Sequence, residues 1–149
     1  MALPSITSYP LPTQHDLPPS RVSWRLRPDS AALLVHDMQG YFVRAFPADA
    51  APMPGVIANI AALIARCDGL GIPVFYTAQP GRQDPLERGL QQDFWGPGMS
   101  SAPEDQHVIA ALAPRPADTV LTKWRYSAFQ RSDFEQRLRA RGRSQLMIA

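Results

Sequence analysis

The stretch AALLVHDMQGY, residues 31–41, decides the fold, because it opens with an uninterrupted apolar run and reaches a carboxylate two residues after that run ends. Such a run predicts a strand over 31–36 that is covered on both faces, as in a parallel sheet. Asp37 can be a simple loop or cap residue. Alternatively, it takes part in binding or catalysis, because α/β proteins bind ligands at the carboxyl ends of their strands. The rest of the sequence decides between these interpretations.

His36 directly precedes this carboxylate. Successive side chains of a strand point to opposite faces, so His36 and Asp37 are expected on opposite sides. We therefore interpret His36 as a packed or hydrogen-bonded histidine rather than a catalytic one.

Helices and strands alternate along the rest of the chain. Apolar residues at helical spacing predict a long helix over 54–70, and Ser132 with Glu135 predicts a capping box for a helix that runs to about residue 141. The sequence also predicts strands over 72–78, over 118–123 and from 144 on. It predicts a short helix over 104–112. This order predicts an α/β fold, a three-layer α/β/α arrangement around a mostly parallel, Rossmann-like sheet. Since the sequence stops inside the fourth strand, we expect the domain to be truncated in its C-terminal part.

Residues 1–29 are rich in proline and cannot form a long helix or a central strand. We expect them to form an N-terminal arm that lies over a single α/β domain of residues 30–149. The segment 80–103 is polar and broken by Gly and Pro, with a helical turn near 86–90. Long loops of this kind are usually functional, and Phe94 and Trp95 argue against disorder.

The composition, 45% hydrophobic and 19% charged, is that of a soluble globular domain. No stretch is long and apolar enough to span a membrane and no secretory signal opens the chain, so we expect a cytoplasmic protein. The net charge of +2 is small. The basic segment RLRARGR, residues 137–143, lacks interleaved aromatics, which favours a solvated helix end over a nucleic-acid surface. The single cysteine, Cys67, is interpreted as a core residue and excludes a thiolate metal cluster.

Three predicted strands end next to functional groups, at Asp37, Gln79 and Lys123. Parallel strands place their carboxyl ends along one edge of a sheet, so these side chains can converge. Lys123 is the only lysine among the 15 Lys and Arg residues, and a lysine is a compact charge whose protonation is readily shifted. No G-x-G-x-x-G motif follows the first strand, so a dinucleotide site has no support. The sequence thus favours a chemical role for Asp37.

Four blocks, LLVHDMQGYF, FYTAQP, ERGLQQDFWGPGM and LTKWRYSAF, resemble the motifs of the isochorismatase family in order and spacing, and SYPLP in the arm is similar to the same proteins. The resemblance covers nearly the whole chain. It is strongest to the branch that acts on isochorismate or its 2-amino-2-deoxy analogue in siderophore and phenazine biosynthesis. It implies a hydrolase that converts isochorismate to 2,3-dihydro-2,3-dihydroxybenzoate and pyruvate without a cofactor or metal.

The resemblance also implies roles for individual residues. Asp37 would be the catalytic acid and Lys123 its partner. The substrate-binding residues that it implies are Gln79, Arg88, Phe42, Trp95 and Tyr126. Arg88 suits a dicarboxylate substrate, because a guanidinium donates two parallel hydrogen bonds to a carboxylate.

The chemistry of an enol ether fits this assignment. Hydrolysis needs a proton delivered to the terminal methylene carbon, after which water traps the oxocarbenium ion. An acid in this role must carry a proton when the substrate is bound. Lys123 then either orients Asp37 or binds substrate while charged, or it loses its proton on burial, and the sequence leaves these alternatives open.

Three other functions remain open. The first is hydrolysis of 2-amino-2-deoxyisochorismate, and the second is a nicotinamidase-type cysteine amidohydrolase, which would need a thiol in the turn after the fourth strand, beyond Ala149. The third is a carrier or scaffold module, since some relatives fuse this domain to an aryl carrier protein and RLRARGR could dock an acidic partner. The expected partners are a small dicarboxylate, an aryl carrier domain or synthetase, and a second copy in a homo-oligomer such as a dimer. No nucleic-acid or membrane partner is expected.

Overall fold

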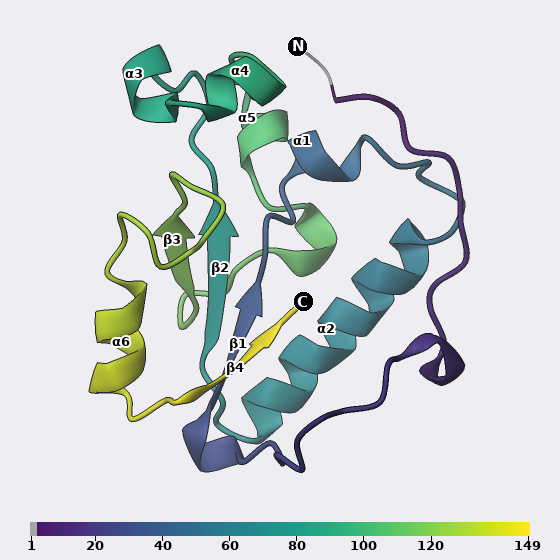
Figure 1. Ribbon diagram of the computed structural model, residues 1–149, viewed down its shortest axis with the longest axis vertical. Helices are drawn as coiled ribbons and strands as arrows, with labels where there is room; N and C mark the ends of the chain where they lie inside the picture. The colour runs from purple at the N-terminus through teal and green to yellow at the C-terminus, as the bar shows by residue number, and fades with distance from the viewer. Residues whose placement is uncertain (1–2) are drawn as a thin grey trace.

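The computed structural model describes residues 3–149, which form a parallel four-stranded sheet flanked by helices (Figure 1). The strands are β1 (Ala31–Val35), β2 (Val74–Ala78), β3 (Thr119–Thr122) and β4 (Gln145–Ile148), in the spatial order β3-β2-β1-β4. β1 pairs in parallel with β2 and β4, and β2 pairs with β3. The predicted α/β class is confirmed, and each strand lies within two residues of its predicted bounds.

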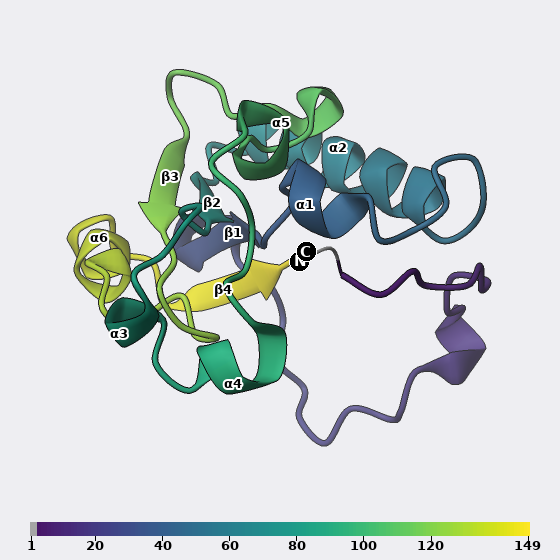
Figure 2. The same cartoon turned by 90° about the horizontal axis from the view of Figure 1, so that it is seen from above.

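The sheet separates two hydrophobic cores because the side chains of β1 alternate between its faces and are all at most 1% exposed. The covering helices are α2 (Met53–Gly69) and α6 (Phe134–Ala140). Leu33 packs with Ile60 and Cys67 of α2, whereas Leu34 packs with Phe134 of α6. Figure 2 shows these helices on opposite sides of the sheet. Burial raises the pKa of the Cys67 thiol, which fits its predicted place in the core.

Four short helices lie over the carboxyl ends of the strands, above the sheet in Figure 1. They are α1 (Gly40–Val43), α3 (Pro85–Arg88), α4 (Gln91–Trp95) and α5 (Pro103–Gln106). Two of them, α3 and α4, occupy the polar segment 80–103, where only one helical turn was predicted. Gly89 and Gly96 end them with φ values of 57° and 60°, in the left-handed region that favours glycine. The segment is therefore an ordered cap over this edge of the sheet.

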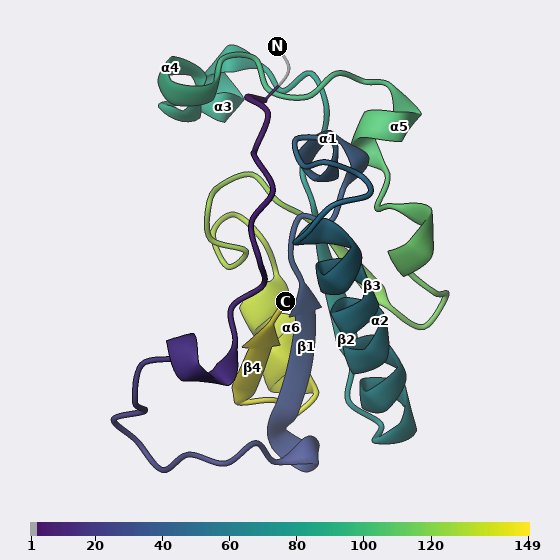
Figure 3. The same cartoon turned by 90° about the vertical axis from the view of Figure 1, so that its right-hand side faces the viewer.

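The N-terminal arm follows the outside of the domain, extended except for the 3₁₀ turns η1 (Gln14–Asp16) and η2 (Pro28–Ser30) (Figure 3). Ile6 N donates to Ala45 O at 2.7 Å, which ties the start of the arm to the segment after α1. Arg27 N donates to Gln145 Oε1 at 2.8 Å at its other end. Of the helices in residues 3–149, none is both long and apolar enough to cross a membrane.

The predicted helix over 104–112 is wrong. After α5 the chain is extended through Val108, which bridges to Gln39, and it ends in the 3₁₀ turn η3 (Ala110–Leu112). Tertiary hydrogen bonds replace helical ones: Ile109 N donates to Met38 O at 3.0 Å, and Gln106 O accepts from Gln39 Nε2 at 2.6 Å. Bonds to the loop after β1 therefore override local helix propensity.

The predicted capping box is also wrong. Ser132 Oγ donates to Ala128 O at 2.5 Å and accepts a 3.3 Å hydrogen bond from Phe134 N, while Glu135 accepts from Arg139. The helix begins at Phe134, whose ring is fully buried against the sheet, and its N-cap is Asp133. Ser132 thus lies one residue before the capping position.

Asp118 stabilises the turn before β3, at the opposite end of that strand from Lys123. Its side chain is 2% exposed and accepts hydrogen bonds from Arg115 N at 2.8 Å and from Arg115 Nε and Nη2 at 3.1 and 3.0 Å. Burial alone would raise the pKa of the Asp118 carboxyl, but the hydrogen bonds and charge of Arg115 outweigh it and lower the pKa.

We expect Asp118→Ala to reduce the free energy of unfolding by about 1–3 kcal/mol, because the Arg115 amide loses its partner. The folded-state pKa is lowered, so the wild-type advantage is fully present above the unfolded value of 3.8 and is lost as pH falls through the folded value. Urea unfolding at neutral pH and near pH 2 measures both. An equal loss at the two pH values would contradict this account.

Candidate active site

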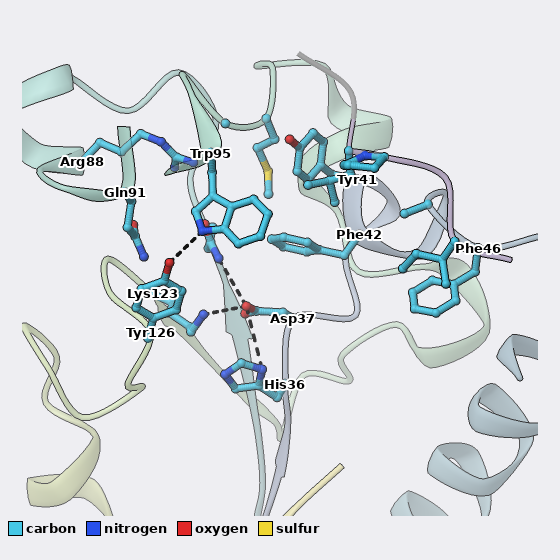
Figure 4. Close-up of a pocket in the computed structure, with 17 residues that line it drawn as sticks. His36, Asp37, Tyr41, Phe42, Phe46, Arg88, Gln91, Trp95, Lys123 and Tyr126 are labelled. Atoms are coloured by element: carbon cyan, nitrogen blue, oxygen red, sulfur yellow. Dashed lines mark hydrogen bonds and ion pairs between the residues drawn. The ribbon is translucent and has the colours of Figure 1, made fainter. Parts of the chain in front are cut away.

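A cavity of about 500 Å³ opens at the carboxyl ends of β1, β2 and β3 (Figure 4). This is the size of a small-molecule site. Among the residues that line it are all seven that the sequence pointed to: Asp37, Phe42, Gln79, Arg88, Trp95, Lys123 and Tyr126. The parallel topology explains why residues from three strands meet there, since all the strands end at one edge.

Asp37 is held by three side-chain donors. Thr77 Oγ1 donates to Oδ1 at 2.7 Å, and Lys123 Nζ and Gln79 Nε2 donate to Oδ2 at 2.6 and 3.2 Å. Its backbone has a φ of 53°, which is uncommon for a residue other than glycine. Donors from neighbouring strands and a turn in the left-handed region favour the chemical interpretation of Asp37 over a simple loop cap.

Lys123 reaches Asp37 from the end of β3, on the far side of β2. Its backbone N donates to Ala78 O at 2.9 Å, which extends the pairing of β3 with β2 by one residue. The Lys123 side chain is 3% exposed and that of Asp37 is 13% exposed. Burial of either charge alone would be costly, so each stabilises the other at this depth.

The prediction that His36 points away from Asp37 is wrong. His36 also lines the cavity, and its Nδ1 lies 3.8 Å from Asp37 Oδ2. The left-handed backbone at Asp37 breaks the alternation that an extended strand would impose. Burial lowers the pKa of His36, the charge of Asp37 raises it and that of Lys123 lowers it, with a net lowering that favours the neutral imidazole.

Two buried polar residues that support the site escaped the sequence analysis. Thr77 is fully buried, and besides donating to Asp37 its hydroxyl accepts from Asp37 N at 2.9 Å. Gln39, also fully buried, accepts from Gln79 N at 2.7 Å and donates to Gln79 O and Gln106 O at 2.9 and 2.6 Å. A polar residue inside or just after an apolar strand was the available signal, because such groups need partners when buried.

Arg88 enters the cavity from α3, opposite the strand ends. Its side chain is nearly buried, and Nε donates to Gly96 O at 2.5 Å. Within residues 3–149, its two terminal guanidinium nitrogens make no hydrogen bond. A Cβ at Gly98 would lie 2.7 Å from Nη1, so the glycine leaves room for the guanidinium. Two donors directed at the cavity suit a carboxylate.

Aromatic side chains and the arm form the apolar walls. Phe42 comes from α1, and Trp95 Nε1 donates to the Tyr126 hydroxyl at 2.7 Å, which joins α4 to the loop after β3 (Figure 4). The arm contributes Leu3, Pro4 and Ile6, which sequence reasoning did not assign to the site. The walls are apolar and the polar groups gather in a few places, an arrangement typical of small-molecule sites.

The fold and this cavity define a class: a parallel α/β protein with a buried carboxylate–lysine pair at the carboxyl edge of its sheet. The chain belongs to the isochorismatase family, since the sequence profile of the isochorismatase domain matches residues 31–149. This confirms the resemblance noted in the sequence.

Three curated relatives are similar in sequence to this chain over almost its whole length. It is 53% identical over 148 residues to the isochorismatase of Bacillus subtilis and 51% identical to enterobactin synthase component B of Escherichia coli, and it covers 47% and 52% of those proteins. It is also 51% identical over 146 residues to phenazine biosynthesis protein PhzD1 of Pseudomonas aeruginosa, of which it covers 70%. The chain therefore spans about half the length of the first two relatives.

A solved structure gives the same fold. The cysteine hydrolase of Pseudomonas syringae pv. phaseolicola superimposes with a TM-score of 0.73 at 25% sequence identity, and the match covers 89% of this chain and 64% of that one. Its likeness supports the three-layer arrangement described above.

Proposed function

We propose that the protein hydrolyses the enol ether of isochorismate to 2,3-dihydro-2,3-dihydroxybenzoate and pyruvate. The observation that carries this proposal is the Asp37–Lys123 pair, 2.6 Å apart, in a cavity that also presents the free donors of Arg88. Isochorismate has one carboxylate on its ring and one on its enolpyruvyl group. One matches Arg88, and the other lies within the field of Lys123.

Asp37 is the proton donor in this proposal. The proton goes to the terminal methylene carbon, the carbon–carbon double bond supplies the electron pair, and an oxocarbenium ion forms at the ether carbon. Water adds to that carbon, and the hemiketal collapses to pyruvate and the ring alcohol with return of the proton. Thr77 and Gln79 hold the carboxyl in place for this transfer.

Lys123 is the nearest source of the proton. The pair contains the same number of protons whether it is an ammonium beside a carboxylate or an amine beside a carboxylic acid. Substrate excludes water from the cavity, and this loss of solvation favours the neutral pair over the ion pair. Transfer over 2.6 Å from Lys123 Nζ to Asp37 Oδ2 would therefore prepare the acid.

Release of pyruvate from isochorismate, coupled to lactate dehydrogenase and NADH, tests the proposal. We expect turnover that depends on the protein and saturates with substrate. A rate no higher than the spontaneous background would reject it.

A second candidate substrate is 2-amino-2-deoxyisochorismate. The observation that favours it is the nearly equal identity of the chain to the B. subtilis isochorismatase and to PhzD1, 53% and 51%. The enol ether and both carboxylates are common to the two substrates, so the same mechanism serves both. The coupled assay run on each compound gives the preference.

An aryl carrier domain or a synthetase, and a second copy of the protein, remain the proposed macromolecular partners. The basic segment RLRARGR offers a weak docking surface, because much of it is already engaged within the domain. Arg137 pairs with Asp133, Arg139 pairs with Glu135, and Arg143 donates to Pro28 O. A partner would have to compete with these contacts.

Gly98→Ala should weaken substrate binding by displacing Arg88. The new Cβ would lie within 3.0 Å of three guanidinium atoms, and the φ of 75° adds backbone strain. We expect KM for isochorismate to rise on the order of 10-fold with a smaller change in kcat, since a ground-state contact is lost. Gly142→Ala is the control, because its φ is 63° and no atom lies within 4 Å of the added Cβ. Equal KM values for the two variants would contradict the role given to Arg88.

A further inference from the structure

Gln91 is a buried polar side chain in the cavity that no step above uses. It is 8% exposed, it lines the cavity, and its amide has no hydrogen-bond partner among residues 3–149. The fully buried Gln39, by contrast, makes hydrogen bonds with both amide atoms. Neither amide atom of Gln91 is among the fully buried polar atoms that lack a partner, so the amide is accessible from the cavity that it lines, and a group that fills the cavity is its natural partner.

The position of Gln91 indicates which part of the substrate it meets. Asp37 must reach the methylene carbon, so the enolpyruvyl group lies at the strand ends and the ring lies toward α3 and α4. Figure 4 shows Gln91 between Arg88 and Tyr126, with its amide directed toward Tyr126. Arg88 ends α3 and Gln91 begins α4, so the two side chains enter the cavity side by side.

The three substituents of the substrate ring lie on consecutive carbons, in the order in which the cavity groups are arranged. The carboxylate is on carbon 1, the hydroxyl or amino group is on carbon 2 and the enol ether is on carbon 3. With the carboxylate on Arg88 and the enol ether at Asp37, the substituent on carbon 2 lies between them, on the side of the cavity that Gln91 lines.

We propose that Gln91 hydrogen-bonds the substituent on carbon 2 and sets the preference between the hydroxyl and the amino substrate, an inference that rests on the proposed function. An amide can donate to and accept from a hydroxyl, whereas it can only accept from an ammonium. Gln91 is therefore suited to the hydroxyl of isochorismate. A carboxylate at this position would favour the ammonium of the amino substrate. It would disfavour isochorismate, which carries the same two carboxylates without a compensating ammonium.

Three variants test this role: Gln91→Leu, Gln91→Glu and the control Gln92→Leu. Gln92 is the next residue on α4, and its Oε1 is buried without a partner among residues 3–149, but it does not line the cavity, so it controls for the loss of an amide outside the site. The kcat and KM of each purified protein are measured with isochorismate and with 2-amino-2-deoxyisochorismate, and melting temperatures verify folding.

We expect Gln91→Leu to lower kcat/KM for isochorismate on the order of 10–100-fold, mainly through KM, because a hydroxyl is left without its partner. Gln92→Leu should stay within about 2-fold of the wild type, since substitutions away from the site have small effects. Gln91→Glu should raise the ratio of kcat/KM for the amino substrate over isochorismate by about 10-fold or more, because an ion pair with the ammonium replaces its hydrogen bond to a neutral amide.

The inference is overturned if Gln91→Leu behaves like Gln92→Leu, or if Gln91→Glu leaves the substrate ratio unchanged. A wild-type protein that releases pyruvate from neither substrate would instead reject the proposed function itself. The two failures are thus distinguishable in one set of assays.

Discussion

Asp37→Asn is expected to reduce kcat for pyruvate release by at least about 100-fold, the low end for loss of a general acid, with a modest change in KM. An amide cannot deliver the proton that the methylene carbon needs. The fold should tolerate the change, because asparagine is nearly isosteric and adopts the left-handed backbone conformation of Asp37, φ 53°, as readily as aspartate does. Initial rates and a thermal melt on the same preparation give both quantities.

Asp118→Ala is the matched control for this variant. It also removes a carboxylate that accepts three hydrogen bonds, but at the other end of β3. We expect it to lower the melting temperature while leaving kcat per folded molecule unchanged, the reverse of the Asp37→Asn pattern. A fully active, normally stable Asp37→Asn protein would remove Asp37 from the mechanism.

Lys123→Met should be nearly as damaging to kcat, again on the order of 100-fold. Methionine fills a similar volume but leaves the Asp37 carboxylate, 13% exposed, without its cation and without its proton source. The double variant with Asp37→Asn should lose little more than either single one, because residues that act as a unit are not additive. Fully multiplicative losses would mean that the two residues act independently.

Lys123→Arg separates the two roles of the lysine. Arginine keeps the positive charge but does not give up a proton under working conditions. If Lys123 supplies the proton to Asp37, the arginine variant stays as slow as the methionine variant. Recovery of most of the wild-type kcat by arginine would reduce Lys123 to a charge that orients Asp37.

The elements governed by local periodicity were predictable from the sequence. The apolar run of β1 and the helical spacing of α2 both reflect burial against a neighbour, and they lie within two residues of the predicted bounds. The convergence of Asp37, Gln79 and Lys123 followed from one topological rule, that parallel strands end at one edge.

Features set by long-range contacts were not predictable in this way. The segment 104–112 is broken because Gln39 and Met38 bind its backbone, and no local pattern reports those bonds. His36 turns into the cavity because of one left-handed residue. Gln91 looked like one polar residue among many in a polar loop, and only the folded chain shows that it is buried and faces the cavity.

The buried place of Cys67 bears on the amidohydrolase alternative. Cys67 is 2% exposed, packs in the core between α2 and the sheet, and is not among the residues that line the cavity. Burial also raises the pKa of its thiol, which disfavours the nucleophilic thiolate. A cysteine mechanism at Asp37 and Lys123 therefore cannot use Cys67.

Hydrolysis of isochorismate in ¹⁸O-labelled water tests the central claim most directly. Protonation of the methylene carbon by Asp37 leads water to the ether carbon, so the bond between that carbon and the ring oxygen breaks. The mass of the ring product, 2,3-dihydro-2,3-dihydroxybenzoate, reports which bond was cleaved. The account predicts a diol without ¹⁸O, formed in amounts equal to pyruvate and lost in Asp37→Asn. One atom of ¹⁸O in the diol would mean attack at the ring carbon and would contradict it.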